Sequence, residues 1–383
     1  MPKLNSLITE IPEATSIAIN QIVADKKNRN ERVYVYSLGE AFFDIPRFEI
    51  TNDEWNNGYH YCDSLGDYSL REKISEMYSK RYGVEVNPKN EILISAGSKA
   101  IILMLLKTIL NPGEEVIFQE PAWLSYKEQI KLVGGVCIPI EYDRDVRDFE
   151  NYITPKTKAI IINNPNNPSG KIFSIGEMKI LLNLAEKYDL FILSDEAYSD
   201  FVPSPKDFIS FASLDTNKNH TLTVNSLSKN MGLSGWRIGY AIANHEVIKQ
   251  LLKLNQHLIT CAATILQKYI AKHFWQILEV TLPQAQSMAL KRLEVQKILN
   301  ELGIKEIEGG GGRGTFYFLI DVSKFSGSAE ELAYELLLKY NIATVPGIAY
   351  GESTKNFLRF GIGVENLSDI KKSLQIIKNL CSQ

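Results

Sequence analysis

Short apolar segments rich in valine and isoleucine recur along this chain, and stretches with helical periodicity separate them. The apolar segments lie at residues 91–97, 114–121, 158–165, 190–198, 220–228 and 235–243. Near-continuous hydrophobicity is typical of strands buried on both faces. Strands that alternate with helices form mainly parallel sheets with right-handed crossovers. The sequence therefore predicts an α/β fold with a mainly parallel sheet flanked by helices.

The C-terminal part of the chain has a different pattern. Residues 244–302 are rich in Leu, Lys, Gln and Glu and are expected to be helical. The elements predicted after them are a strand, a helix, two strand pieces and a last helix, at 315–322, 328–340, 342–346, 357–363 and 367–380. We expect a large domain over residues 45–280 and a small α+β domain over residues 281–383, to which the N-terminal segment 1–44 contributes.

Composition excludes several classes of protein. The 383 residues carry a formal net charge of −3 and no lysine-rich run, which argues against a nucleic-acid partner and a membrane surface. No apolar run reaches the length of about 18 residues that spans a bilayer, and the N-terminus does not resemble a signal peptide. The four cysteines lack C-x-x-C spacing and the five histidines are scattered, so neither disulfides nor a metal site is expected. A soluble, cytoplasmic protein fits these features.

Unusual polar residues stand at the ends of several predicted strands. They are Gly97, Ser98 and Lys99 after the first strand, the loop NNPNNPSG (163–170) after the third, Asp195 and Tyr198 at the fourth, and Ser226 and Lys229 at the fifth. Ligands of open parallel sheets bind outside the carboxyl ends of the strands. One edge of the sheet is therefore expected to gather these residues.

Lys229 lies in a segment of low charge, NSLSKNMGLSGWRIGY (225–240), in which Arg237 and Tyr240 are the only other ionisable side chains. Burial beside a cation lowers the pKa of a lysine, and a neutral amine can form a Schiff base with a carbonyl. An aspartate can hold a ring nitrogen protonated. A phosphate needs N–H groups at a helix start, hydroxyls and an arginine. This set of residues suits a phosphorylated aromatic aldehyde.

The tract GGGGRG (309–314) fits the pattern G-x-G-x-x-G. No predicted strand precedes it and no predicted helix follows it, so it lacks the context of a dinucleotide-binding turn. We expect a loop that leads into the strand at 315.

The segment SLSKNMGLSGWRIGY (226–240) resembles the pyridoxal phosphate (PLP) attachment segment of class I/II aminotransferases, the aspartate aminotransferase-like family of fold type I. Further segments resemble motifs of this family in the same order. They are YHYCDSLGDYSLR (59–71), PAWLSY (121–126), NNPNNPSG (163–170), SDEAY (194–198) and NFLRFGIG (356–363). The resemblance runs from about Gly39 to Arg359. It implies a seven-stranded, mainly parallel sheet in the large domain, PLP as the cofactor, and a homodimer.

The resemblance also implies roles for single residues. Lys229 would form the Schiff base with PLP and move a proton between substrate and cofactor, and Asp195 would pair with the pyridine nitrogen. Tyr198 and Asn167 would hydrogen-bond the phenolic oxygen of the ring, on which Trp123 would stack. The phosphate would be held by Ser226, Arg237 and the turn of Gly97, Ser98 and Lys99, with Tyr61 reaching over from the neighbouring subunit. Arg359 and the Gly39 backbone would bind the substrate α-carboxylate.

Each of these residues also has a structural interpretation. Asp195 and Ser98 could cap helices, Asn167 could serve a Pro-rich turn, Arg237 could form an ion pair, and Lys229 could be a surface lysine. Trp123 and Tyr61 could be core aromatics, and we expect Phe316 to be one. The cofactor roles are favoured because Tyr198 and Asn167 stand at the offsets that the family shows.

The resemblance implies transfer of an amino group between an α-amino acid and a 2-oxo acid. Lys99 stands where one subgroup carries a lysine for a distal carboxylate, whereas Glu13 and the segment GEAFFD (39–44) depart from that subgroup. The side chain of the substrate therefore stays open. The main alternative is another PLP reaction on the same fold, such as that of a C–S β-lyase. A cofactor-sensing regulator is disfavoured because too few residues precede the fold to form a DNA-binding module.

Overall fold

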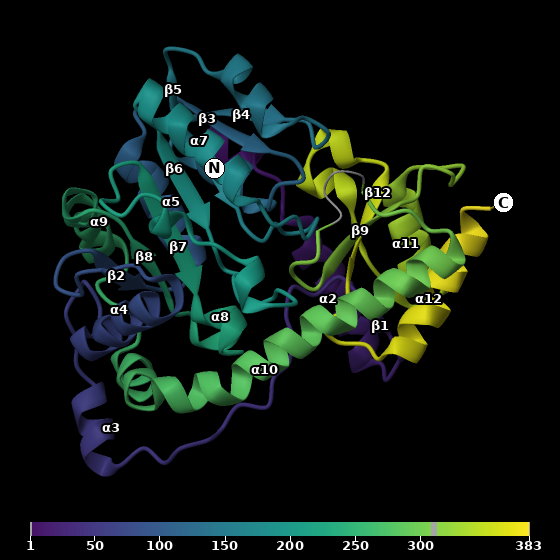
Figure 1. Ribbon diagram of the computed structural model, residues 1–383. Coiled ribbons are helices and arrows are strands. Elements are labelled where there is room, and N and C mark those ends of the chain that lie inside the picture. The colour runs from purple at the N-terminus through teal and green to yellow at the C-terminus, as the bar shows by residue number, and fades with distance from the viewer. Residues whose placement is uncertain (1, 308–311, 383) are drawn as a thin grey trace.

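A seven-stranded sheet forms the centre of the larger part of the molecule in the computed structural model, which describes residues 2–307 and 312–382 (Figure 1). In spatial order the strands are β2 (Ile92–Ser95), β8 (Gly239–Ile242), β7 (Thr221–Ser226), β6 (Phe191–Asp195), β5 (Thr157–Asn163), β3 (Glu115–Gln119) and β4 (Val136–Ile140). Strand β8 runs antiparallel to β2 and to β7, and the other neighbouring strands are parallel. The predicted α/β fold with a mainly parallel sheet is confirmed.

Strand β4 is absent from the sequence-based prediction, and its surroundings explain why. It lies at one edge of the sheet, and only Ile140 of its five residues is buried. It also contains Pro139, which cannot donate to a strand ladder and is confined to edges or bulges. The apolar run that marks a doubly covered strand is therefore missing.

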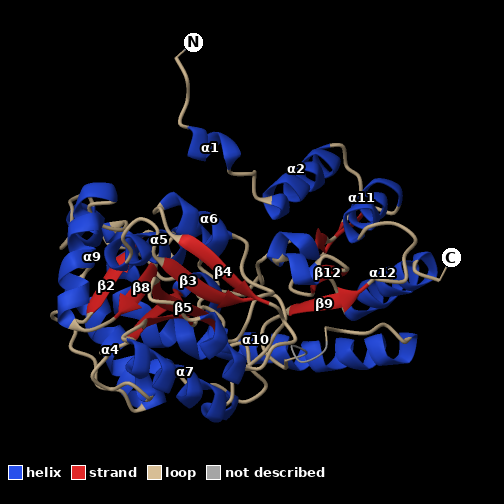
Figure 2. Ribbon diagram, turned by 90° about the horizontal axis from the view of Figure 1, so that it is seen from above, coloured by secondary structure: helices blue, strands red, loops and turns tan. Residues whose placement is uncertain are grey.

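Helices cover both faces of this sheet. Figure 2 shows α5 (Ser98–Ile109) and α6 (Ser125–Leu132) on one face, and α4 (Tyr68–Tyr82) and α7 (Ile175–Tyr188) on the other. Helix α7 begins after a capping box in which Ser174 and Glu177 satisfy each other's backbone N–H groups. Helix α9 (His245–Leu258) packs beside α5 through Ile248 and Leu251.

The smaller part of the molecule has its own sheet, of order β11-β12-β9. Its strands are β9 (Tyr317–Asp321), β11 (Val345–Pro346) and β12 (Phe357–Gly361), and both pairings are antiparallel. Helices α11 (Ala329–Lys339) and α12 (Leu367–Leu380) pack against it. The N-terminal segment joins this part, because β1 (Tyr34–Val35) pairs in parallel with β10 (Ile342–Ala343). Helix α2 (Thr15–Asn28) precedes β1. The short α-helices not yet named are α1 (Ser6–Glu10), α3 (Asn52–Gly58) and α8 (Leu227–Asn230).

One long helix connects the two parts. Helix α10 (Thr264–Leu302) runs from below the large sheet to the side of the small one (Figure 1). Ile270, Phe274 and Ile277 belong to a core cluster of the larger part, whereas Val295 and Leu299 belong to the core of the smaller part. The helix is kinked at His273, whose backbone is not helical, and it contains Pro283. Because it continues through residue 280 between these two positions, the expected domain boundary there stays a prediction.

The glycine tract and the search for a membrane-spanning segment bear on two further expectations. Residues 309–311 of the glycine tract lie outside the described residues. Among the helices that the structure describes, none combines the length and the hydrophobicity needed to cross a membrane.

Candidate active site

A cavity of about 220 Å³ lies at the carboxyl ends of β5, β6 and β7, where the last residues are Asn163, Asp195 and Ser226. Parts of both sheets reach it, because Arg359 of β12 and Tyr317 of β9 line it as well. The predicted site residues that line this cavity are Gly39, Ser98, Lys99, Trp123, Asn167, Asp195, Tyr198, Ser226, Lys229, Arg237 and Arg359. The fold therefore brings together residues that are more than 300 positions apart in the sequence.

Lys229 lies on α8, the single helical turn that follows β7. Its Nζ donates a hydrogen bond of 2.5 Å to the Gly39 carbonyl and lies 5.4 Å above the centre of the Tyr198 ring. Burial lowers the pKa of Lys229 from its usual value to about 8, and the positive charges of Arg359 and Arg237 add to this effect, which Glu40 opposes. A substantial fraction of this amine is therefore neutral near physiological pH, as nucleophilic and proton-transfer chemistry requires.

Asp195 is the last residue of β6 and is buried. The Tyr126 hydroxyl donates a hydrogen bond of 2.7 Å to Oδ2, and the Ala197 N–H donates one of 3.1 Å to Oδ1. Burial raises the pKa of Asp195, while these two donors and Lys229 act in the opposite direction. Tyr126 is a site residue that sequence reasoning missed, although it is the last residue of the segment PAWLSY.

The start of α5 has the features of an anion site. Gly97 precedes the helix with φ +85°, and no side chain caps the first turn. A Cβ at Gly97 would lie 2.5 Å from the Arg237 Nη2, so the guanidinium packs directly against this glycine. Free N–H groups at a helix start and a nearby arginine suit a phosphate. Ser98 and Ser226 line the same cavity and add two hydroxyls.

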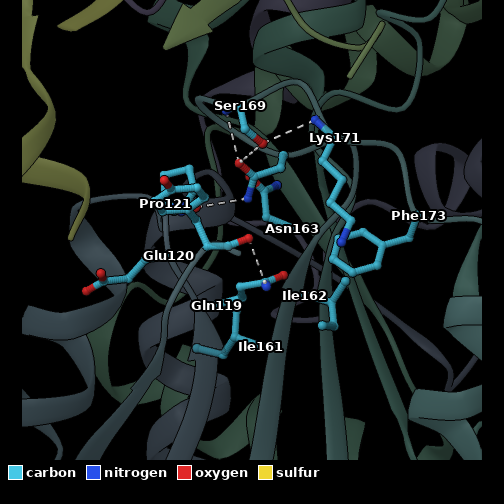
Figure 3. A pocket seen from close by; sticks show the side chains of 11 residues that line it. Gln119, Glu120, Pro121, Ile161, Ile162, Asn163, Ser169, Lys171 and Phe173 are labelled. Atoms are coloured by element: carbon cyan, nitrogen blue, oxygen red, sulfur yellow. Dashed lines mark hydrogen bonds between the residues drawn. The ribbon is translucent and has the colours of Figure 1, made fainter. Parts of the chain in front are cut away.

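The loop of residues 163–170 is held by hydrogen bonds from its own asparagines. The Asn166 side chain accepts from the Ser169 N–H (3.1 Å) and hydroxyl (2.8 Å) and donates to the Pro121 carbonyl (3.1 Å), beside a small pocket of about 20 Å³ (Figure 3). Asn163 accepts a hydrogen bond of 2.6 Å from the Asn167 N–H. These bonds place Asn167 in the cavity with its buried side-chain oxygen unpaired, so this oxygen is free to bind a ligand.

A second cation lines the cavity with Lys229. Arg359 is buried, donates to the Ser37 carbonyl at 2.5 Å, and has an unpaired Nε. The rings of Tyr317 and Tyr350 lie 4.7 and 5.2 Å from its guanidinium carbon. A buried guanidinium with free donor capacity is suited to a carboxylate.

Tyr317 is the other site residue that sequence reasoning missed. Its hydroxyl forms a hydrogen bond of 2.9 Å with the Tyr198 hydroxyl. A Cβ at Gly39 would lie 3.0 Å from the same Tyr317 oxygen. Tyr317 therefore connects Tyr198, the Gly39 backbone and Arg359. Within TFYFLIDV nothing distinguishes it from a core aromatic such as Phe316, which is buried in the small-part core as expected.

Three predicted residues have contrasting positions. Trp123 lines the cavity and meets the Tyr126 ring edge to face, with ring centres 5.3 Å apart. Lys99 places its ammonium 5.1 Å from the centre of the Trp123 ring. Tyr61 does not line the cavity and is 86% exposed, so it is not a core aromatic in this chain.

Comparison with known proteins identifies the family. The family described as aminotransferase class I and II matches residues 50–374. The aromatic-amino-acid aminotransferase 2 of Thermococcus litoralis is 32% identical over 86% of this chain and 87% of that protein. The aspartate aminotransferase of Pyrococcus abyssi is 31% identical over 84% and 85%. A solved structure of aspartate aminotransferase from Thermus thermophilus with maleate superposes with a TM-score of 0.89 at 26% identity, and covers 98% of this chain and all (100%) of that one.

These relatives confirm the family and the fold type that the six sequence segments predict, and they do not favour the lyase alternative. With the fold, the gathered residues and the relatives in agreement, this chain belongs to the class I and II aminotransferases and is an enzyme that transfers amino groups.

Proposed function

We propose that this enzyme binds PLP in the cavity at the carboxyl ends of β5 to β7 and transfers an amino group between an α-amino acid and a 2-oxo acid. One observation carries the proposal. The amine of Lys229, whose pKa is about 8, shares a cavity with the buried carboxylate of Asp195 and with the anion site at the start of α5. Amine, carboxylate and anion site match the aldehyde, the ring nitrogen and the phosphate of PLP.

The residues present fit this cofactor. The phosphate would bind at the N–H groups of α5, Ser98, Ser226 and Arg237, where Gly97 leaves room. The side-chain amide of Asn167 and the Tyr198 hydroxyl line the cavity and would donate hydrogen bonds to the phenolic oxygen. Trp123 would cover one face of the ring. When bound, PLP supplies an electron sink for the electrons released at the substrate Cα.

The chain itself supplies binding and proton transfer. Arg359 would bind the α-carboxylate of the substrate through its free donor capacity, and the Gly39 backbone would lie beside it. Lys229 would anchor the cofactor and then take the proton from the substrate Cα, which a group with a pKa of about 8 can do near neutral pH. Asp195 would stay charged, supported by Tyr126 and Ala197, and would hold the ring nitrogen protonated.

We also propose a homodimer with shared sites. Trp55, Tyr59 and Tyr61 are large aromatic side chains that are 43%, 71% and 86% exposed. Exposed aromatics concentrated in one segment are typical of an interface. Tyr61 would reach the phosphate bound by the neighbouring subunit. A cytoplasmic location would keep the thiols of the four free cysteines reduced.

A single-turnover experiment tests the function. Purified protein loaded with PLP is mixed with single α-amino acids, and the absorbance of the bound cofactor is followed. We expect one amino acid to change the spectrum once and stop, and a 2-oxo acid to restore it. Borohydride reduction followed by peptide mapping should label Lys229.

Lys229→Ala should abolish the spectral cycle, and the exposed Lys249→Ala serves as the control. Turnover by Lys229→Ala at the normal rate would overturn the proposal. So would failure of the unmodified protein to take up PLP.

A further inference from the structure

A second, larger cavity adjoins the site. It measures about 610 Å³ and lies between the N-terminal segment 11–15, helix α6, strand β3, the edge strand β4, and the turn 348–352. Lys99, Trp123 and Leu124 line both cavities, so the two meet at these residues. The additional space therefore borders the cavity that holds Lys229 and Arg359.

The lining of this second cavity is mostly apolar. Phe118, Ala122 and Tyr350 are buried around it, and Leu132 and Ile348 remain 40% and 39% exposed in it. Ile11, Pro12 and Pro139 add further apolar surface. An apolar cavity with a few polar groups is the usual form of a small-molecule site. Covering exposed apolar surface of this kind with a ligand lowers the free energy of the complex.

The charged residues around the cavity divide into engaged and free groups. Glu120 accepts hydrogen bonds from the N–H groups of Glu352 and Ser353, and Glu128 pairs with Lys131. Within the described part of the chain, Glu13, Lys99 and Lys127 form no ion pair. Among these three, Lys99 alone also lines the first cavity, and desolvation together with the charge of Arg237 lowers its pKa. The junction thus holds an amine without an ion-pair partner among the described residues, and the space beyond it is mostly apolar.

The size of the second cavity argues against a short substrate alone. A cavity of about 150 Å³ suffices for benzene, and pockets of roughly 300–1,000 Å³ hold drug-sized ligands. At about 610 Å³, this cavity exceeds what the side chain of aspartate or phenylalanine would fill. A short carboxylate side chain would end at Lys99, whereas a long apolar one would continue past it.

We propose that this cavity receives the side chain of one of the two substrates, an α-amino acid whose side chain is long and mostly apolar. The inference rests on the proposed function, because the first cavity must hold the α-carboxylate and the amine. The other substrate, with a short acidic side chain, would use only the first cavity and Lys99. The enzyme would thus read two unlike side chains in two adjoining spaces.

A homologous series of substrates tests this inference. The kcat/KM is measured for straight-chain α-amino acids from alanine to 2-aminooctanoate, with a common 2-oxo acid as acceptor. Full burial of one methylene is worth roughly 0.8 kcal/mol, so kcat/KM should rise by up to about fourfold for each added carbon. A flat or falling series, with turnover of alanine or aspartate intact, would overturn this inference and leave the proposed function standing. Absence of turnover and of spectral change with every amino acid would instead overturn the proposed function.

A matched pair of variants tests whether the second cavity causes the preference for long apolar side chains. Leu132→Asp places a charge in the second cavity, and Leu338→Asp places one on the exposed side of α11, where Leu338 is 61% exposed. We expect Leu132→Asp to reduce the ratio of kcat/KM for 2-aminooctanoate to that for alanine by at least about tenfold, and Leu338→Asp to leave the ratio unchanged. If Leu132→Asp lowers both substrates equally, the cavity is covered by something other than the substrate side chain, such as the N-terminal segment, and the inference is wrong.

Discussion

Asp195 shows how opposing effects set the charge of one buried group. Burial favours the protonated carboxyl, whereas the Tyr126 hydroxyl, the Ala197 N–H and the Lys229 charge favour the carboxylate. The proposed role of Asp195 requires the carboxylate, because only a charged group can hold a ring nitrogen protonated. Tyr126 is therefore more than a packing residue.

Replacing Tyr126 by phenylalanine should weaken cofactor binding and activity. The variant keeps the ring that contacts Trp123 but loses the 2.7 Å hydrogen bond, so the pKa of Asp195 rises further. A hydrogen bond to a charged group is worth about 1.5–3 kcal/mol, which corresponds to a loss of roughly ten- to a hundredfold in kcat/KM. The acid limb of the pH profile should move to higher pH. Tyr340→Phe, at an exposed position, is the control, and an unmoved acid limb would contradict this role for Tyr126.

Single residues differ in how far the sequence predicts them. Lys229, Asp195 and Asn167 stand at or after the ends of predicted strands, and the structure gathers them with Arg237 in one cavity. Tyr126 and Tyr317 act on partners 69 and 119 residues away, and an aromatic residue in an apolar segment gives no sign of which partner its hydroxyl will meet. Tyr61 lies outside the cavity of its own chain, so its role stays a prediction.

At the scale of elements, the turn between β2 and α5 combines an unusual backbone with a close contact. Gly97 has φ +85°, a region that side chains disfavour, and it lies against the Arg237 guanidinium. The helix start and the arginine therefore share one anion site only while residue 97 lacks a Cβ.

Gly97→Ala should reduce affinity for PLP by at least about tenfold, because the new methyl group displaces the guanidinium and closes the site where the phosphate would bind. Gly113→Ala is the matched control, since Gly113 has the same φ of +85° but nothing lies within 4 Å of its Cβ position. Equilibrium titration with PLP and thermal unfolding separate the two effects. Equal losses of affinity in both variants would show that backbone strain alone is responsible.

Elements with a strong periodic pattern are predicted well. Helix α12 spans the predicted residues 367–380, and α11 lies within one residue of the predicted bounds 328–340. The missed elements are short or lie at edges. Strand β1 has two residues, and β4 exposes much of its surface, so neither has the continuous hydrophobicity from which the other strands are predicted.

At the scale of the whole molecule, the proposed dimer can be tested by mixing subunits. Lys229→Ala and Tyr61→Ala each damage one component of every site. In a two-fold symmetric dimer with shared sites, a hybrid of the two contains one site with both native residues, so random exchange should restore about a quarter of the wild-type activity. Lys229→Ala mixed with Arg359→Ala is the control and should restore none, because these two residues serve the same site from one subunit. A chain that sediments as a monomer while active would contradict the proposal.

The stability of the folded enzyme should depend on the ionisation of Glu196. This carboxyl is buried, and burial raises its pKa to about 7, although Ser210, Phe211 and Ser194 donate hydrogen bonds to it. In the unfolded chain the group ionises near 4.5. Between these values the folded state holds a proton that the unfolded state has lost, so the stabilising contribution declines as pH rises from about 4.5 to 7.

Glu196→Gln should remove this decline. The amide cannot ionise, and the Ser210 hydroxyl can turn to accept a hydrogen bond from it. Thermal unfolding from pH 5 to pH 8 should therefore show a smaller fall in Tm for the variant than for the wild type. Parallel curves for the two proteins would contradict the assignment. Glu186→Gln, at an exposed position of α7, is the control.

Helix α10 has a consequence for how the molecule comes apart. After the kink at His273 it contributes Phe274 and Ile277 to one core, and its last part contributes Val295 and Leu299 to the other. Loss of either core would leave half of this continuous stretch without its apolar support, and an unsupported helix of that kind is marginal in water. The two lobes should therefore melt cooperatively, as one calorimetric transition whose van't Hoff and calorimetric enthalpies agree.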